Sequence, residues 1–184
     1  MQKFKNKAVL VIGGGVGMGL CIAKSFSEQG AKVVVSELTE QLGRNAVETI
    51  SNSGGIACAL QCNLTQRDQV KSMIDQAAGV YGHIDILVLT AASSKGGRIV
   101  EMSDDDYDEI VQCNISAIFW IAKYAAPYLS RAEGSGRLIY ISSSSANREF
   151  IPGMIPYVAS KSYMNAFVRG MAVEFGPMNI LVNT

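Results

Sequence analysis

Histidine and tryptophan are almost missing from this sequence of 184 residues, which has one of each. The single histidine, His83, stands in the turn Tyr81-Gly82-His83 and is expected to be solvated, so a His-dependent nucleophilic triad is disfavoured. Cys58 and Cys62 are four residues apart, but no second Cys or His pair lies near them in the sequence. No metal site is therefore predicted, and the four cysteines are expected to be ordinary, mostly buried thiols.

An excess of one charge is also missing, because 16 basic residues balance 16 acidic ones. Nucleic acids and anionic membranes require a basic excess, so neither is an expected partner. No apolar run reaches the roughly 18 residues of a membrane-spanning helix. The basic start of the chain leads into glycines rather than into a signal-peptide cleavage site, and a cytoplasmic protein is expected.

Short β-branched runs alternate with longer amphipathic stretches, which is typical of parallel βαβ units. Strands are predicted at 8–12, 32–36, 56–61, 84–90, 137–142 and 180–182. Helices are predicted at 17–29, 39–53, 103–130 and 157–175, and one more after Thr65 as its N-cap. Right-handed crossovers then predict an α/β fold: a Rossmann-type, doubly wound parallel sheet in three αβα layers. It forms a single domain over residues 1–184.

The first predicted strand runs into a glycine-rich turn that fits the spacing G-x-x-x-G-x-G rather than G-x-G-x-x-G. Glycines between a strand and a helix let a pyrophosphate approach the backbone and the helix N-terminus. Many turns are glycine-rich, but the place of this one in the first βαβ unit favours nucleotide binding. The candidate cofactor-binding residues of the turn are Gly13, Gly15, Val16, Gly17, Met18 and Gly19.

Glu37 lies at the end of the second predicted strand. A carboxylate there can accept hydrogen bonds from the adenosine ribose and repel a 2′-phosphate. Leu38 follows, where a residue that reads a 2′-phosphate would be Arg or Lys. NAD is therefore predicted as the cofactor over NADP, and a solvated charge at a strand end is the alternative role for Glu37.

Tyr157 and Lys161 are four residues apart in a predicted helix, so both lie on one face. An ammonium close to a phenol favours the phenolate. Tyr157 could then exchange the proton of a carbonyl/alcohol pair during hydride transfer. The spacing alone occurs by chance in many helices.

The glycine turn, Asn114, the serine run Ser142–Ser145 and Tyr157-x-x-x-Lys161 occur in an order that resembles the short-chain dehydrogenase/reductase family, over essentially the whole chain. The resemblance implies an NAD-dependent oxidoreductase with a small alcohol or ketone substrate. It implies that Tyr157 is the general acid/base and that Lys161 supports it and binds the nicotinamide ribose. It also implies that a serine binds the substrate oxygen and that Asn114 helps to hold a relay water.

The serine has two candidates. Counting from the end of the predicted strand points to Ser143, and counting back from Tyr157 points to Ser144. We favour Ser143, with one extra residue in the loop that follows.

The sequence departs from the family pattern at three places. Ile12 replaces the usual Thr before the glycines, so a side-chain hydrogen bond is lost from the turn. Leu89-Thr90-Ala91-Ala92 replaces Asn-Asn-Ala-Gly, and Thr90 can supply only part of that bonding. Asn63 replaces the Asp that contacts adenine. Besides the turn and Glu37, the candidate cofactor-binding residues are Asn63, Leu64, Thr90, Ala91, Tyr157 and Lys161.

The resemblance also implies residues beyond Thr184, so the chain is predicted to be a core that lacks the usual C-terminal substrate-loop segment. Residues 93–102 and 148–156 are expected to line the substrate pocket, with an apolar lining from Phe150, Ile151, Met154 and Ile155. A homodimer or homotetramer is expected. Two other functions stay open: non-catalytic nucleotide binding or scaffolding, and a cofactor-independent structural role through oligomers.

Overall fold

The fold is a six-stranded parallel sheet in the order β3-β2-β1-β4-β5-β6, as seen in a computed structural model that describes residues 2–146 and 151–184. The strands are β1 (Ala8–Ile12), β2 (Lys32–Glu37), β3 (Ile56–Gln61), β4 (Ile86–Leu89), β5 (Gly136–Tyr140) and β6 (Ile180–Asn183). The order reverses between β1 and β4, which is the switch point of a doubly wound sheet. The predicted fold class is confirmed.

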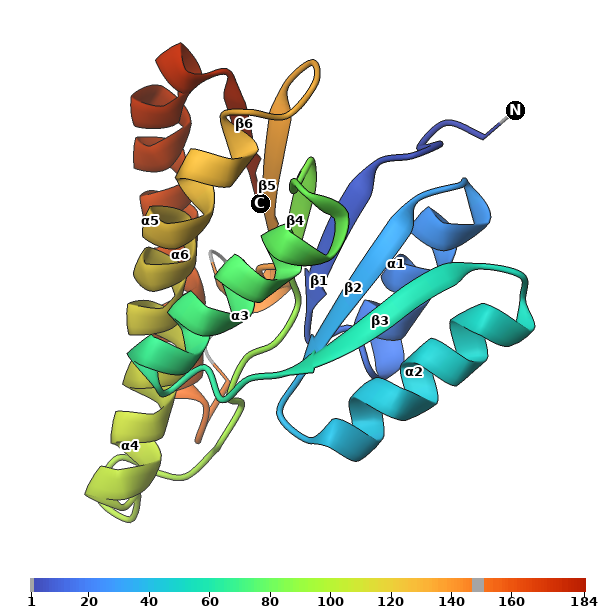
Figure 1. The fold of residues 1–184 in the computed structure, drawn as a ribbon. Helices are drawn as coiled ribbons and strands as arrows, with labels where there is room; N and C mark the ends of the chain where they lie inside the picture. Colours follow the sequence, from blue (N-terminus) through green and yellow to red (C-terminus); the bar gives the residue numbers. More distant parts are fainter. Residues whose placement is uncertain (1, 147–150) are drawn as a thin grey trace.

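Helices cover both faces of this sheet (Figure 1). They are α1 (Gly17–Glu28), α2 (Glu40–Asn52), α3 (Arg67–Tyr81), α4 (Asp104–Val111), α5 (Ala117–Leu129) and α6 (Ile155–Phe175). One apolar core joins α1 and α2 to the sheet, and the other joins α3, α5 and α6 to its opposite face. Strands β1 and β4 are buried along their whole length, as expected for central strands covered on both faces.

Two local predictions about helices need correction. The third helix begins at Arg67, and Thr65 does not cap it: its backbone N–H and hydroxyl donate to Asn63 Oδ1 at 3.0 and 2.9 Å. In this Asx-type turn the Thr65 hydroxyl oxygen accepts from the Gln66 side chain at 3.2 Å instead of from a backbone N–H of the helix. The predicted helix 103–130 is divided by a π-helical segment, η1 (Gln112–Ser116), which separates α4 from α5.

The predicted setting of the cysteines and the histidine needs correction. Cys62 is buried, but Cys58 and Cys113 are half-buried and Cys21 is exposed. His83 lies partly exposed, and its Nε2 is 3.0 Å from Oδ2 of the buried Asp85, which also pairs with Lys7 at 2.9 Å. The side chains of Lys7, His83 and Asp85 lie at the amino ends of β1 and β4. The glycine turn lies at the opposite, carboxyl end of β1.

Within residues 2–146 and 151–184, the helices are all too short or too polar to cross a bilayer. The same residues contain no group of three or more His, Cys, Asp or Glu side chains that could hold a metal ion.

Candidate functional site

A cleft of about 970 Å³ lies at the carboxyl ends of the strands, where doubly wound sheets bind their ligands. Ile12, Ser36 and Ile141 bring the ends of three strands to its wall. The predicted site residues that line the cleft are Gly13, Val16, Gly17, Met18, Gly19, Glu37, Asn63, Leu64, Thr90, Ala91, Tyr157 and Lys161. The structure therefore gathers residues from both ends of the sequence into one cavity.

Two glycines of the turn serve different physical needs. A Cβ on Gly19 would lie 1.8 Å from the carbonyl oxygen of Gly13, so this glycine lets α1 pack directly against the turn. Gly17 has φ +52°, and a Cβ there would meet none of the described atoms within 4 Å. Gly17 therefore leaves open space at the N-terminus of α1, where backbone N–H groups attract an anion.

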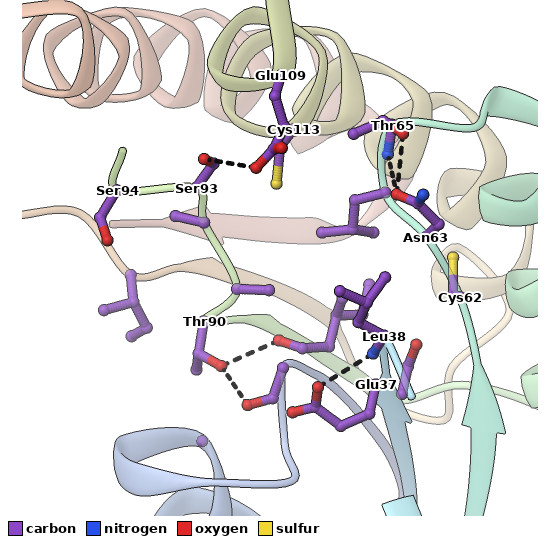
Figure 2. A pocket seen from close by; sticks show the side chains of 18 of the residues that line it. Glu37, Leu38, Cys62, Asn63, Thr65, Thr90, Ser93, Ser94, Glu109 and Cys113 are labelled. Carbon is purple, nitrogen blue, oxygen red and sulfur yellow. Dashed lines mark hydrogen bonds between the residues drawn. The ribbon is translucent and has the colours of Figure 1, made fainter. Parts of the chain in front are cut away.

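Thr90 braces the same turn from the end of β4. Its hydroxyl lies 3.0 Å from the carbonyl oxygen of Ile12 and 2.9 Å from that of Gly13, and both contacts appear as dashed lines in Figure 2. The turn has no hydroxyl of its own at Ile12, which is buried. Thr90 thus supplies from a neighbouring strand a side-chain contact that the turn sequence lacks.

Glu37 is held against the turn rather than extended into solvent. Its Oε1 accepts a hydrogen bond from the Gly15 N–H at 2.8 Å, and its Oε2 accepts one from Leu38 at 3.1 Å. Gly15 itself does not line the cleft. The carboxylate is therefore fixed at the wall of the cleft by two backbone donors, beside Leu38 (Figure 2).

Asn63 lines the cleft, but its amide oxygen is already engaged by Thr65, as described above. An acceptor with both lone pairs in use is a poor partner for a further donor. The side-chain amide nitrogen remains for a ligand, and Leu64 beside it is buried and lines the cleft.

Tyr157 and Lys161 face the same cleft from helix α6. Lys161 is 2% exposed, and burial lowers the pKa of its ammonium to about 8. Its Nζ donates to the carbonyl oxygen of Ile141 at 2.8 Å and lies 5.8 Å from the centroid of the Tyr157 ring. An ammonium has three N–H donors, and among the described residues only the Ile141 carbonyl oxygen accepts one of them. Two donors are therefore left for a ligand.

Asn114 lies in η1, is buried, and ties three segments together. Its Oδ1 accepts from the Ser93 N–H, and its Nδ2 donates to the Ser93 carbonyl oxygen, both at 2.8 Å. The same Nδ2 lies 3.0 Å from the Ser160 hydroxyl, which donates to the carbonyl oxygen of Tyr157 at 2.7 Å. The Asn114 side chain thus holds the Tyr157 turn of α6 against the loop after β4, with both amide N–H donors and one lone pair of Oδ1 in use.

The serine run has three different environments. Ser143 has its hydroxyl 2.8 Å from that of Ser145 and does not line the cleft. Ser144 is exposed in the 3₁₀ turn η2 (Ser144–Ala146) and does not line it either. Ser142, which sequence reasoning did not select, does line it.

Sequence reasoning also missed the wall formed by α4. Asp105, Asp108 and Glu109 of α4 line the cleft, together with Gln112, the first residue of η1. Their i, i+4 spacing could have placed them on one helix face, but not shown which way that face points. Lys95 partly neutralises this wall, because its Nζ lies 2.9 Å from Glu109 and also pairs with Asp106.

Two thiols line the cleft as well, Cys62 and Cys113. Burial raises the pKa of Cys62 to about 11 and also raises the pKa of Cys113. Both are thiols rather than thiolates at neutral pH, so neither is poised as a nucleophile.

The expected substrate loops meet at one point: the Gly97 N–H donates to the Gly153 carbonyl oxygen at 2.8 Å. A Cβ on Gly96 would lie 3.1 Å from the Met154 sulfur. Ile151 and Ile155 are each exposed by more than two fifths. Residues 148–150, including Phe150, lie outside the described residues.

The sheet order and the cleft at its switch point define a Rossmann-type α/β protein. The family model for the short chain dehydrogenase matches residues 7–184. The chain therefore belongs to the short-chain dehydrogenase family.

Curated relatives and solved structures agree with this membership. Short chain aldehyde dehydrogenase 1 of Euphorbia lathyris is 31% identical over 184 residues, which are 99% of this chain and 63% of the relative. Hydroxynaphthalene reductase-like protein Arp2 of Metarhizium majus is 33% identical and covers 99% of this chain, which spans 67% of that relative. A short chain dehydrogenase from Burkholderia cenocepacia, solved in complex with NADP, has a TM-score of 0.92 at 31% identity. The match covers 98% of this chain and 73% of the Burkholderia chain.

Proposed function

We propose that the chain binds NAD in this cleft and acts as an oxidoreductase on an alcohol/carbonyl pair, with Tyr157 as the general acid/base. The observation that carries the proposal is that Tyr157 and Lys161 line the same cavity as the glycine turn and Glu37. When bound, the nicotinamide supplies the hydride donor or acceptor, which no side chain can replace.

The residues present fit such a cofactor. Gly17 leaves open space at the N-terminus of α1 for the pyrophosphate, and the Glu37 carboxylate is fixed where ribose hydroxyls can donate to it. A carboxylate there also repels a 2′-phosphate, which is our reason for proposing NAD rather than NADP.

Lys161 and Tyr157 divide the remaining work. Lys161 has two donors for ribose hydroxyls, and its cation stabilises negative charge on the Tyr157 oxygen. Tyr157 holds or releases the proton of the substrate oxygen. Asn114 keeps this turn of α6 in place through Ser160, and its backbone carbonyl is proposed to hold the relay water. Ser143 is proposed to bind the substrate oxygen once its hydroxyl has broken the hydrogen bond with Ser145.

Dinucleotide binding without turnover is the second candidate. The pairing of the Ser143 hydroxyl with Ser145, outside the cleft lining, favours it. Mixing the protein with NADH and then with a panel of ketones separates the two functions. NADH fluorescence enhancement without oxidation by any ketone would favour binding alone.

Tyr157→Phe tests the catalytic role. Because general acid–base catalysis contributes about a hundredfold or more, turnover should fall at least by that factor while NADH still binds. Tyr163→Phe is the matched control, since Tyr163 lies on the same helix and stacks on Phe167. Unchanged turnover in Tyr157→Phe would refute the assignment.

A further inference from the structure

Three buried hydroxyls have no hydrogen-bond partner among the described residues: those of Ser27, Ser36 and Ser142. Buried polar groups nearly always have a partner, because an unsatisfied hydroxyl has lost its bonds to water and gained none in return. Such a group becomes a candidate ligand contact where its residue borders a cleft.

Two of the three belong to the cleft. Ser36 lines it at the end of β2, next to Glu37. Ser142 lines it just beyond β5, next to Ile141, whose carbonyl oxygen accepts the Lys161 bond. Ser27 lies on α1 outside the cleft, where a Cβ on Gly55 would be 2.0 Å from its hydroxyl oxygen.

We propose that the Ser36 and Ser142 hydroxyls bind the dinucleotide, Ser36 at its adenosine half and Ser142 at its nicotinamide half. This inference rests on the proposed function. The assignment of halves follows from neighbours: Ser36 shares a strand end with Glu37, and Ser142 lies at the Tyr157–Lys161 end of the cleft.

The chemistry of serine suits both positions. A serine hydroxyl donates one hydrogen bond and accepts others, so it can pair with ribose hydroxyls or with a carboxamide. Each hydroxyl oxygen is now enclosed by protein, while the residue itself borders the cleft. Binding therefore requires each side chain to turn to the staggered χ1 position that places its oxygen at the cleft.

The test compares NADH with ADP, which lacks the nicotinamide riboside, in calorimetric titrations of the purified chain. Ser142→Ala should weaken NADH binding about two- to tenfold, the range of one net hydrogen bond, and leave ADP binding unchanged. Ser36→Ala should weaken both ligands by a similar factor. Ser27→Ala is the matched control and should change neither.

Thermal unfolding of the ligand-free variants gives a second readout. Because the removed hydroxyl has no partner in the free protein, each of the three variants should melt at the same temperature as the parent or higher. A general structural lesion would lower both the melting temperature and the affinity for both ligands.

Several results would overturn the inference. They are NADH binding by Ser142→Ala equal to the parent, equal losses of NADH and ADP in that variant, or parental affinities in Ser36→Ala. In each case the parent still binds NADH, and the proposed function stands. A parent chain that binds neither ligand contradicts the proposed function as well.

Discussion

Replacing Lys161 by methionine should change how the stability of the free protein depends on pH. Lys161 is nearly fully buried, and burial lowers the pKa of its ammonium from 10.5 to about 8. Between these two values the unfolded chain binds more protons than the folded protein, so the free energy of unfolding rises with pH. From pH 7 to pH 10 the gain from this one group is roughly 2 to 3 kcal/mol, since each pKa unit corresponds to about 1.4 kcal/mol.

Urea denaturation of the parent and of Lys161→Met at pH 7 and pH 10 measures this gain. Over that interval the free energy of unfolding of the parent should rise by roughly 2 to 3 kcal/mol more than that of the variant. Lost packing is the same at both pH values and cancels, and the change in the bond to Ile141 on deprotonation is already contained in the pKa shift. Lys123→Met, at an exposed lysine on α5, should follow the parent. Parallel pH profiles for parent and Lys161→Met would refute the claim that this ammonium is desolvated.

Two further pairs of variants test the cofactor site. Glu37→Ala should lower the ratio of NADH to NADPH affinity about tenfold, equivalent to about 1.4 kcal/mol. Glu40→Ala, at an exposed residue in the first turn of α2, should leave the ratio unchanged. Equal affinities of the parent for NADH and NADPH would contradict the role of Glu37. Gly19→Ala should destabilise the protein by roughly 3 kcal/mol in urea denaturation, because its Cβ meets a backbone oxygen. Gly17→Ala should lower the free energy of unfolding by only about 1 kcal/mol, because of its positive φ, and should also weaken NADH binding. A larger loss of stability in Gly17→Ala than in Gly19→Ala would contradict the packing argument.

The arrangement of strands and helices could be predicted because local patterns carry it. Buried runs such as Ala8–Ile12 and the caps and glycines between them fix each element, and the ends agree with the structure within two residues for the strands. Right-handed crossovers then predict a twisted parallel sheet with helices on both faces, whereas the order of its strands comes from the structure. The glycine turn and the Tyr157–Lys161 spacing are likewise local features.

The rest depends on contacts between distant residues, which one sequence does not reveal. The π-helical segment at Asn114 coincides with bonds to Ser93 and Ser160, 21 and 46 residues away. Thr90 braces a turn 77 residues before it, and so compensates for Ile12 in a way that its own neighbours do not suggest. The orphaned hydroxyl of Ser142 is visible only when every possible partner has been placed.

A crystal structure of the chain with NADH is the most direct test of the site. We predict the pyrophosphate beside Gly17 and the nicotinamide end next to Tyr157 and Lys161. Electron density for the dinucleotide outside this cleft, or with its adenine at the Tyr157 end, would contradict the account.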